Sequence, residues 1–322
     1  MPKIHFGGQS YDCDGKSVLD CLAAHSITIP SSCRAGICQT CLMQATSGKV
    51  PENSQNGLKP TLVAQGYFLA CSCVPEDDME ILLPGHGAGR LSARILDIEP
   101  LNEDIACIKL APARPLAYKA GQFINFFKDE STARSYSLAS IPRIDNCIKL
   151  HVRKIPDGKV STWIHENLSS GDLVSISEAA GNCFYVPGNP EQGLLLIGTG
   201  SGLAPLYGIV QDALLQGHSG PIRLYHGSFE VAGLYLIDEL RVLARKYPNF
   251  SYTPCVSEQT APDGFRGGIV LDIALADVTD LAGWRVYLCG NPAMVNAAKN
   301  KTFLAGASMR DIYADPFLPA AT

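Results

Sequence analysis

Apolar and polar residues follow three different patterns along this chain of 322 residues. Residues 2–83 are expected to form short strands and one helix at residues 17–25, which Ser17 is expected to cap. Residues 91–187 contain short strand-like runs separated by turn residues, as in an antiparallel barrel. The barrel strands are expected at residues 92–99, 105–111, 122–127, 134–139, 147–154 and 172–177, with one helix at 159–168.

The third pattern begins near residue 190, where continuous apolar runs alternate with helical stretches. Runs at residues 194–198, 221–227, 250–256 and 284–290 are expected to form buried strands of a parallel α/β domain. Two stretches rich in glycine and proline, 83–91 and 187–193, separate the three patterns and are typical of linkers. We therefore expect a multidomain protein with domains at residues 1–86, 91–187 and 190–322.

Composition excludes several classes of function. The chain is 46% hydrophobic and 18% charged, its mean hydropathy is +0.08, and its net charge is −5. No apolar window of about 18 residues is present, so no membrane association is expected, and the acidic balance argues against nucleic acid as a partner. The 12 cysteines follow a start without the layout of a signal peptide, which favours a reducing, cytoplasmic location.

The clearest chemical signal is a set of four cysteines, Cys33, Cys38, Cys41 and Cys71. The first three have the spacing C-x4-C-x2-C and the fourth follows much later, as in a plant-type 2Fe–2S cluster. A zinc site usually pairs two short knuckles, and a disulfide framework suits a small secreted chain. Cys73 leaves some ambiguity about the fourth ligand. We favour Cys71, with Cys73 expected on the same strand face as an ordinary neighbour.

Two glycine-containing turns follow expected strands of the third domain. Gly198, Gly200 and Gly202, with Thr199 between them, open a helix whose amides can meet a pyrophosphate. Leu203 stands where the dinucleotide fingerprint requires glycine, and a tight connection alone would explain the turn. The second turn contains Cys289 and Gly290. Both turns are expected at the carboxyl ends of parallel strands, although Cys289 is equally compatible with a packed core thiol.

The expected barrel offers a flavin-like set of side chains on one strand. Arg134 can pair with a phosphate, Tyr136 can stack on a planar ring, and Ser137 can donate a hydrogen bond. An exposed strand with polar alternation explains the same residues without any ligand. Downstream, the helix start at 158–161 is a second possible phosphate site.

Taken together, these motifs resemble the ferredoxin–NADP reductase superfamily. More narrowly, the chain is similar to the NAD(P)H-dependent reductase components of bacterial aromatic-ring oxygenases, of the naphthalene-dioxygenase reductase type. The motifs that carry the resemblance are CRAGICQTC, RSYS, GTGSGLAP, LCGNPAM and IYADPF, in this order along the whole chain. The resemblance implies a β-grasp plant-type ferredoxin domain, an antiparallel β-barrel that binds FAD, and a parallel α/β domain that binds NAD(P)H.

The resemblance also implies roles for single residues. Arg134 would meet the flavin pyrophosphate, Tyr136 would stack on the isoalloxazine, and Ser137 would approach the nitrogen that accepts the hydride. Phe317 would lie near the other face of the flavin, with Asp315 where the family often has an acid. The remaining implied cofactor contacts are His151, Val152, Lys159, Val160 and Ser161 for the flavin, and Gly198, Thr199, Gly200, Gly202, Cys289, Gly290 and Met294 for the nicotinamide nucleotide.

The implied function is electron transfer from NADH through FAD and the 2Fe–2S cluster to a protein acceptor, an oxygenase component or a ferredoxin. Glu230 follows the strand at 221–227 with no nearby arginine for a 2′-phosphate, which favours NADH over NADPH. Reductases of deoxysugar (CDP-hexulose) dehydratases share the three-domain plan and remain an alternative. A binding module that senses redox state through its cluster is a further alternative from another functional class.

Overall fold

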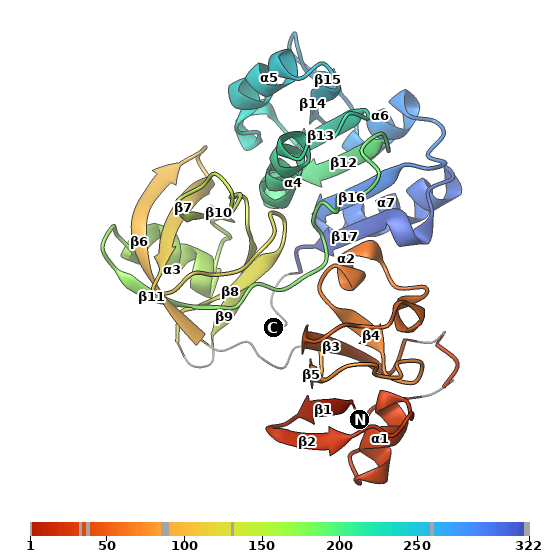
Figure 1. Ribbon diagram of the computed structural model, residues 1–322. Helices are drawn as coiled ribbons and strands as arrows, with labels where there is room; N and C mark the ends of the chain where they lie inside the picture. The colour runs from red at the N-terminus through yellow and green to blue at the C-terminus, as the bar shows by residue number, and fades with distance from the viewer. Residues whose placement is uncertain are drawn as a thin grey trace. The chain divides into compact units, whose positions relative to one another are not determined.

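The computed structural model describes residues 2–31, 34–36, 39–84, 90–129, 132–257 and 261–318 (Figure 1). The chain divides into two compact units, residues 1–88 and 89–322. The boundary between them lies inside the expected linker at 83–91. The second unit contains both the expected barrel and the expected α/β domain, each with its own sheet.

The first unit is built on a mixed five-stranded sheet in the order β2-β1-β5-β3-β4. Gly7 and Gly8 both have positive φ, which suits a two-residue hairpin between β1 and β2. Ser17 caps α1, because its Oγ accepts a hydrogen bond from the Asp20 amide at 3.1 Å. The sequence patterns did not predict η1 or α2. The elements are β1 (Lys3–Phe6), β2 (Gln9–Asp12), α1 (Val18–Ala24), β3 (Leu42–Ser47), η1 (Glu52–Gln55), α2 (Pro60–Val63), β4 (Tyr67–Leu69) and β5 (Met79–Leu82).

The second unit begins with an antiparallel six-stranded sheet in the order β10-β7-β6-β11-β8-β9. A bridge between Leu138 and Leu150 joins the two ends of this order, so the sheet closes into a barrel as predicted. Ile124 and Phe126 on β8 point into its core. The elements are β6 (Arg90–Pro100), β7 (Ile105–Pro112), β8 (Phe123–Phe127), β9 (Ala133–Ser137), β10 (Ile148–Arg153), α3 (Lys159–Asn167) and β11 (Leu173–Ser177).

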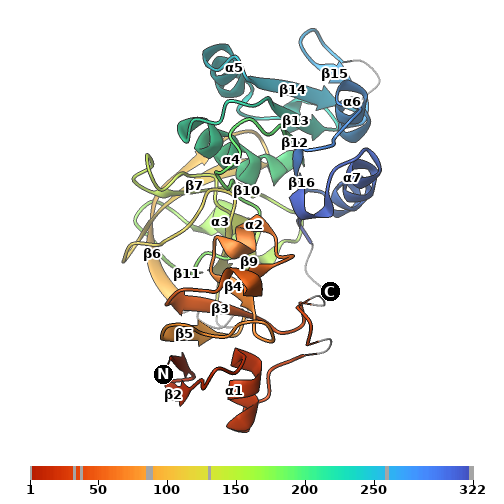
Figure 2. The same cartoon turned by 45° about the vertical axis from the view of Figure 1, so that its right-hand side comes forward.

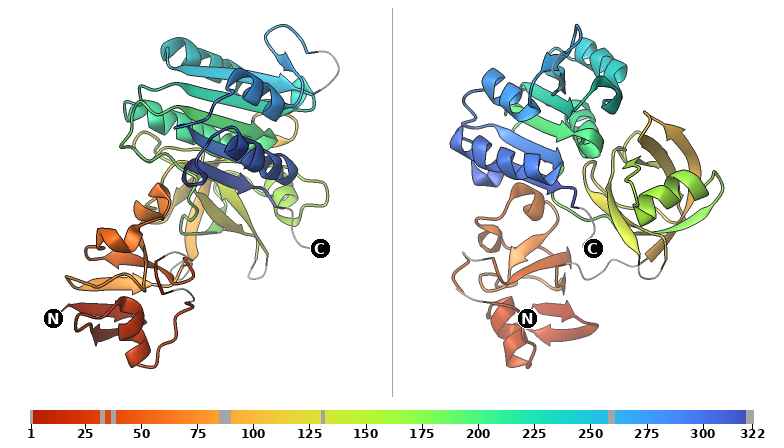
Figure 3. Two further views of the ribbon diagram at one scale, coloured as in Figure 1. Left: turned by 90° about the vertical axis from the view of Figure 1, so that its right-hand side faces the viewer. Right: turned by 180° about the vertical axis from the view of Figure 1, so that it is seen from behind.

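The rest of this unit is a parallel six-stranded sheet in the order β15-β14-β13-β12-β16-β17. Helices α4 and α5 pack on one face of it and α6 and α7 on the other, a doubly wound arrangement (Figures 1, 2 and 3). The strands are β12 (Leu194–Thr199), β13 (Ile222–Ser228), β14 (Phe250–Val256), β15 (Arg266–Gly267), β16 (Arg285–Gly290) and β17 (Ile312–Pro316). The helices are η2 (Gly200–Gly202), α4 (Leu203–Leu215), η3 (Val231–Gly233), α5 (Ile237–Lys246), α6 (Val270–Asp277), α7 (Pro292–Leu304) and η4 (Met309–Asp311).

Within the described part of the chain, no helix is both long and apolar enough to cross a bilayer.

Candidate functional site

Two of the four predicted cluster ligands, Cys41 and Cys71, lie at the same end of one hairpin. Cys41 immediately precedes β3 and Cys71 follows β4 by two residues, while Leu42 pairs with Leu69 across the hairpin. The amide and the thiol of Cys71 both interact with the Cys41 thiol. Cys33 and Cys38 lie outside the described residues, and no group of three possible metal ligands occurs among the residues that are described.

The described part of the cysteine loop curls in a way that suits a cluster. Arg34, Gly36 and Gln39 have φ values of +54°, +72° and +57°, so their backbone is left-handed. Left-handed residues in a short loop can turn backbone amides toward a common side, where the amides can bind anionic sulfur. The geometry of this loop and the convergence of Cys41 and Cys71 fit the predicted 2Fe–2S site.

Cys73 does not share a strand face with Cys71, so this expectation was wrong. Strand β4 ends at Leu69, because the chain turns there toward α1, and both cysteines lie in the segment after it. The Cys73 carbonyl accepts a hydrogen bond from the Val18 amide at 2.8 Å, and its side chain is fully buried. Cys71, which is only partly buried, lies beside Cys41 instead.

The predicted flavin strand is β9, where the three site residues divide between two faces. Tyr136 and Arg134 pair with Ile124 and Phe126, whose side chains point into the barrel core. The ring of Tyr136 packs edge-on against Phe126 at 6.2 Å. Ser137 is on the opposite face and reaches the last strand of the α/β domain, where its hydroxyl donates to Asp315 Oδ2 at 3.4 Å.

The start of α3 offers backbone rather than side chains to a ligand. Val160 is buried in the barrel core, and Ser161 Oγ accepts a hydrogen bond from the Ile155 amide at 3.1 Å. Lys159 is exposed. Any anion at this helix start would therefore be held by amides, with Lys159 as the neighbouring cation.

His151 and Val152 also turn their side chains away from a flavin on the barrel surface. Val152 is fully buried in the barrel core. His151 Nδ1 lies 3.1 Å from the Tyr235 hydroxyl of the α/β domain. A flavin contact from this part of β10 would involve the backbone.

The two glycine turns meet backbone to backbone at the carboxyl ends of β12 and β16, as predicted. A Cβ atom built on Gly202 would lie 2.4 Å from the Cys289 carbonyl oxygen, and one on Gly290 would lie 2.6 Å from the Thr199 oxygen. Thr199 Oγ1 also accepts a hydrogen bond from the Asn291 amide at 3.0 Å. Since no side chain fits between them, glycine is needed at both positions.

Cys289 lies at the centre of this meeting point. It pairs with Asp315 across β16 and β17, and the Phe317 amide donates to the Gly290 carbonyl at 2.8 Å. Its Sγ lies 3.8 Å from Cys183 Sγ, a neighbour for which the sequence offers no signal. Burial raises the pKa of both the Cys289 thiol and the Asp315 carboxyl, so both groups resist ionisation.

Met294 lies on the other side of the parallel sheet. Its half-buried side chain packs with Val295 and the cluster that covers Ile197 and Leu288. Cys289 belongs to the opposite cluster. The structure thus brings Ser137, Cys289, Asp315 and Phe317 together, and leaves the Met294 side chain apart from them.

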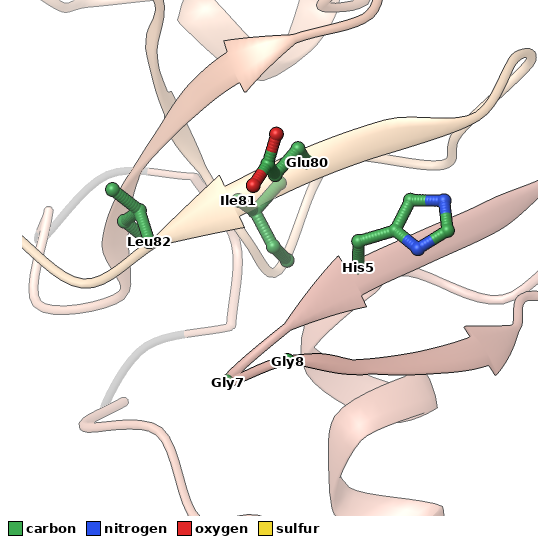
Figure 4. A pocket seen from close by; sticks show the side chains of 6 residues that line it. All are labelled: His5, Gly7, Gly8, Glu80, Ile81 and Leu82. Atoms are coloured by element: carbon green, nitrogen blue, oxygen red, sulfur yellow. The ribbon is translucent and has the colours of Figure 1, made fainter.

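A hollow of about 440 Å³ lies on the first unit and contains none of the predicted site residues. It is open, with side chains from neighbouring strands β1 and β5 along it (Figure 4). Its lining residues are His5, Gly7, Gly8, Glu80, Ile81 and Leu82.

Comparison with known protein families gives three matches in the same order as the predicted domains. Residues 4–76 match the 2Fe-2S iron-sulfur cluster binding domain, residues 92–185 the oxidoreductase FAD-binding domain, and residues 196–300 the oxidoreductase NAD-binding domain. These matches confirm the predicted fold class and the prediction of a 2Fe–2S cluster, FAD and a nicotinamide nucleotide.

Individual relatives match along almost the whole chain. An aromatic O-demethylase reductase subunit from an Amycolatopsis strain is 34% identical over 99% of both chains. The reductase component of the naphthalene 1,2-dioxygenase/salicylate 5-hydroxylase systems of a Ralstonia species is 33% identical over 95% of this chain and 94% of its own. A CDP-6-deoxy-L-threo-D-glycero-4-hexulose-3-dehydrase reductase from Yersinia pestis is 30% identical over 99% and 98%. The crystal structure of an Amycolatopsis cytochrome P450 reductase has a TM-score of 0.70 and 32% identity, covering 100% of both chains.

Proposed function

Because this chain belongs to the family of reductases that join a 2Fe–2S, an FAD-binding and an NAD-binding domain, we propose that it supplies electrons from NADH to an oxygenase component or a ferredoxin. The resemblance to reductase components of aromatic-ring oxygenases is thereby confirmed. The protein is an NAD(P)H-dependent flavin and iron–sulfur oxidoreductase. When bound, FAD accepts a hydride and releases single electrons, and the 2Fe–2S cluster carries one electron at a time.

The observation that carries the proposal is the convergence of Ser137, Cys289 and Asp315. The end of the flavin strand meets the carboxyl ends of β16 and β17 there, through the Ser137–Asp315 hydrogen bond at 3.4 Å. Hydride transfer requires the nicotinamide and the flavin to lie within about 3–3.5 Å of each other. A flavin bound along β9 and a nicotinamide bound at the turns after β12 and β16 would both reach this point, so the two rings would meet beside Ser137.

We assign the following roles to the side chains at this point. Ser137 orients the flavin edge by hydrogen bonding, and Cys289 fills the space behind the nicotinamide. Asp315 holds the Ser137 hydroxyl, and Phe317, whose amide donates to the Gly290 carbonyl, would lie near the other face of the flavin. Arg134 binds the flavin pyrophosphate together with the backbone amides at the start of α3.

We assign the cluster ligands as Cys33, Cys38, Cys41 and Cys71, and the domains as residues 1–86, 91–187 and 190–322. Cys41 and Cys71 support the ligand set because their thiols converge at the end of the β3–β4 hairpin. The domain limits are supported by the separate sheets and by the three matched ranges.

NADH is the proposed donor. Glu230 is exposed after β13, where an adenosine ribose would lie, and its carboxylate would repel the 2′-phosphate of NADPH. Arg241, the next arginine along the chain, is already engaged with Asp238 at 3.7 Å and with the Gly264 carbonyl at 3.3 Å. The ratio of kcat/KM for the two coenzymes tests this preference.

The acceptor can be an oxygenase component or a ferredoxin, since the name of the Ralstonia relative describes that protein as the ferredoxin–NAD(P)+ reductase component of dioxygenase and hydroxylase systems. A sugar dehydratase is the alternative, which the Yersinia relative supports. Measuring NADH-dependent turnover of an oxygenase component and of a sugar dehydratase, each mixed with this protein, distinguishes the two acceptors. Steady NADH oxidation with an artificial acceptor would exclude the redox-sensing module.

The order of electron transfer is tested with Cys41→Ser. This change removes one cluster ligand and leaves the flavin site intact. We expect cytochrome c reduction by NADH to be lost while ferricyanide reduction stays within about twofold of the unchanged protein. Equal loss of both activities with FAD still bound would contradict the proposed order.

A further inference from the structure

His226 is a fully buried histidine directly beneath the first glycine turn, and none of the roles above involves it. It lies on β13 opposite Gly198 of β12. Its Nε2 is 3.1 Å from the carbonyl oxygen of Gly200, and its Nδ1 is 3.5 Å from the hydroxyl of Tyr252. Both ring nitrogens therefore have polar partners inside the protein.

These partners decide which nitrogen carries the proton. The Gly200 carbonyl can only accept a hydrogen bond, so Nε2 must donate to it. Nδ1 is then free to accept from the Tyr252 hydroxyl. Burial lowers the pKa of His226 to about 4, so the ring is neutral at physiological pH and this single tautomer persists.

The hydrogen bond bears on the conformation of the turn. Gly200 has φ +53° and, being glycine, has no side chain to restrict its backbone. A trans peptide is planar, so the Gly200 carbonyl and the Ser201 amide point in opposite directions. Holding the carbonyl toward His226 turns the Ser201 amide away from β13, toward the side on which a helix start binds anions.

We propose that His226 is a positioning residue for nucleotide binding, which aims the Ser201 amide at the dinucleotide pyrophosphate by holding the Gly200 carbonyl. This inference rests on the proposed function, because it takes the turn at 198–202 to be the NADH site. His226 lies outside the glycine motif at residues 198–202, so the inference adds a residue to this site. The Leu203 amide also donates to the Gly200 carbonyl. Because Leu203 belongs to the turn and would rotate with it, this second hydrogen bond does not fix the turn relative to β13.

The competing explanation is that His226 only fills the core. The same domain contains a matched control, His218, which is also buried and neutral. Its Nδ1 lies 3.2 Å from the Tyr185 hydroxyl, and it precedes β13, at the opposite end of that strand from the turn. A change at His218 should therefore cost stability without affecting the nucleotide.

The test compares His226→Leu, His226→Gln, His226→Asn and His218→Leu in the FAD-loaded full-length protein. Glutamine places an N–H close to the position of Nε2, whereas asparagine is too short to do so. The readouts are the Kd for ADP-ribose by calorimetry, KM and kcat for NADH with ferricyanide, and the midpoint of urea unfolding. ADP-ribose contains the pyrophosphate and cannot be oxidised.

We expect His226→Leu and His226→Asn to raise the Kd for ADP-ribose and the KM for NADH about tenfold, as for loss of one hydrogen bond that orients a site. kcat should change less than twofold, and His226→Gln should recover most of the affinity. His218→Leu should lower the unfolding midpoint and leave the Kd unchanged.

Equal affinity in the His226→Asn and His226→Gln proteins would overturn the inference, even if His226→Leu does not fold. An equal loss of affinity in His218→Leu would overturn it as well. If the unchanged protein neither binds ADP-ribose nor oxidises NADH, the proposed function itself fails. Normal NADH oxidation combined with unchanged Kd values in the His226 variants refutes this inference alone.

Discussion

Replacing Gly202 with alanine tests whether the contact between the two glycine turns sets the position of the nicotinamide. Gly202 has φ −60° and ψ −13°, which alanine adopts without strain, so the effect comes from contact alone. The new Cβ would lie 2.4 Å from the Cys289 carbonyl oxygen and 2.8 Å from Gly290 Cα. Restoring an ordinary contact of 3.4 Å requires a shift of about 1.0 Å (3.4 − 2.4 Å) between the turns.

Such a shift has two expected consequences. Overpacking of this kind lowers the free energy of unfolding by about 1–3 kcal/mol. A misplacement of about 1 Å at a reacting centre lowers the rate about 100-fold. We therefore expect Gly202→Ala to bind FAD normally, to unfold at lower urea concentration, and to reduce ferricyanide with a kcat about 100-fold lower.

Gly267→Ala is the control for this experiment. Gly267 also lies outside the left-handed region, and its new Cβ would only meet the Ala261 side chain at 3.3 Å. Its kcat should stay within twofold of the unchanged protein. A Gly202→Ala protein with unchanged kcat would refute the idea that the Gly202–Cys289 contact positions the nicotinamide.

Two further predictions concern the cluster ligands and the acid beside Ser137. Cys71→Ser should lower the iron content and the visible absorbance of the cluster. Cys73→Ala should retain both and lose only about 1 kcal/mol of stability, since Cys73 packs in the core. Loss of iron in Cys73→Ala but not in Cys71→Ser would show that Cys73, and not Cys71, is the fourth ligand. Burial raises the pKa of the Asp315 carboxyl in the folded protein above its value in the unfolded chain. The folded protein therefore becomes less stable as pH rises and this carboxyl ionises. Asp315→Asn should therefore raise the thermal midpoint more at pH 7 than at pH 3.5 while slowing NADH oxidation, and an equal shift at both pH values would contradict this reasoning.

Local patterns predicted most of the fold. The four apolar runs from residue 194 onward became β12, β13, β14 and β16, because continuous apolar strands are stable only when helices cover both faces of a sheet. Ser17 was a readable helix cap, and the barrel runs alternated because one face of each strand points into the core. The short elements η1, α2 and β15 have too few residues to produce a periodic pattern.

The site was less accessible to sequence reasoning because its contacts are distant along the chain. Ser137 and Asp315 are separated by 178 positions, and no spacing rule connects them. Cys183 meets Cys289 across 106 positions from a segment without any motif. The sequence placed Val152 and Met294 in flavin and nicotinamide segments, but the direction of a side chain depends on packing that a motif does not describe.

The β3–β4 hairpin has a consequence for how the first unit matures. Cys41 and Cys71 converge only while Leu42 pairs with Leu69, and a slip of one residue would displace one thiol by about 3.3 Å along its strand. The same slip would turn one of two fully buried side chains toward the other face of the sheet, Met43 if β3 shifts or Phe68 if β4 shifts. A cluster bound by both thiols would thus stabilise the correct register of β3 and β4. Only chains with these two strands correctly paired would then bind the cluster during biosynthesis.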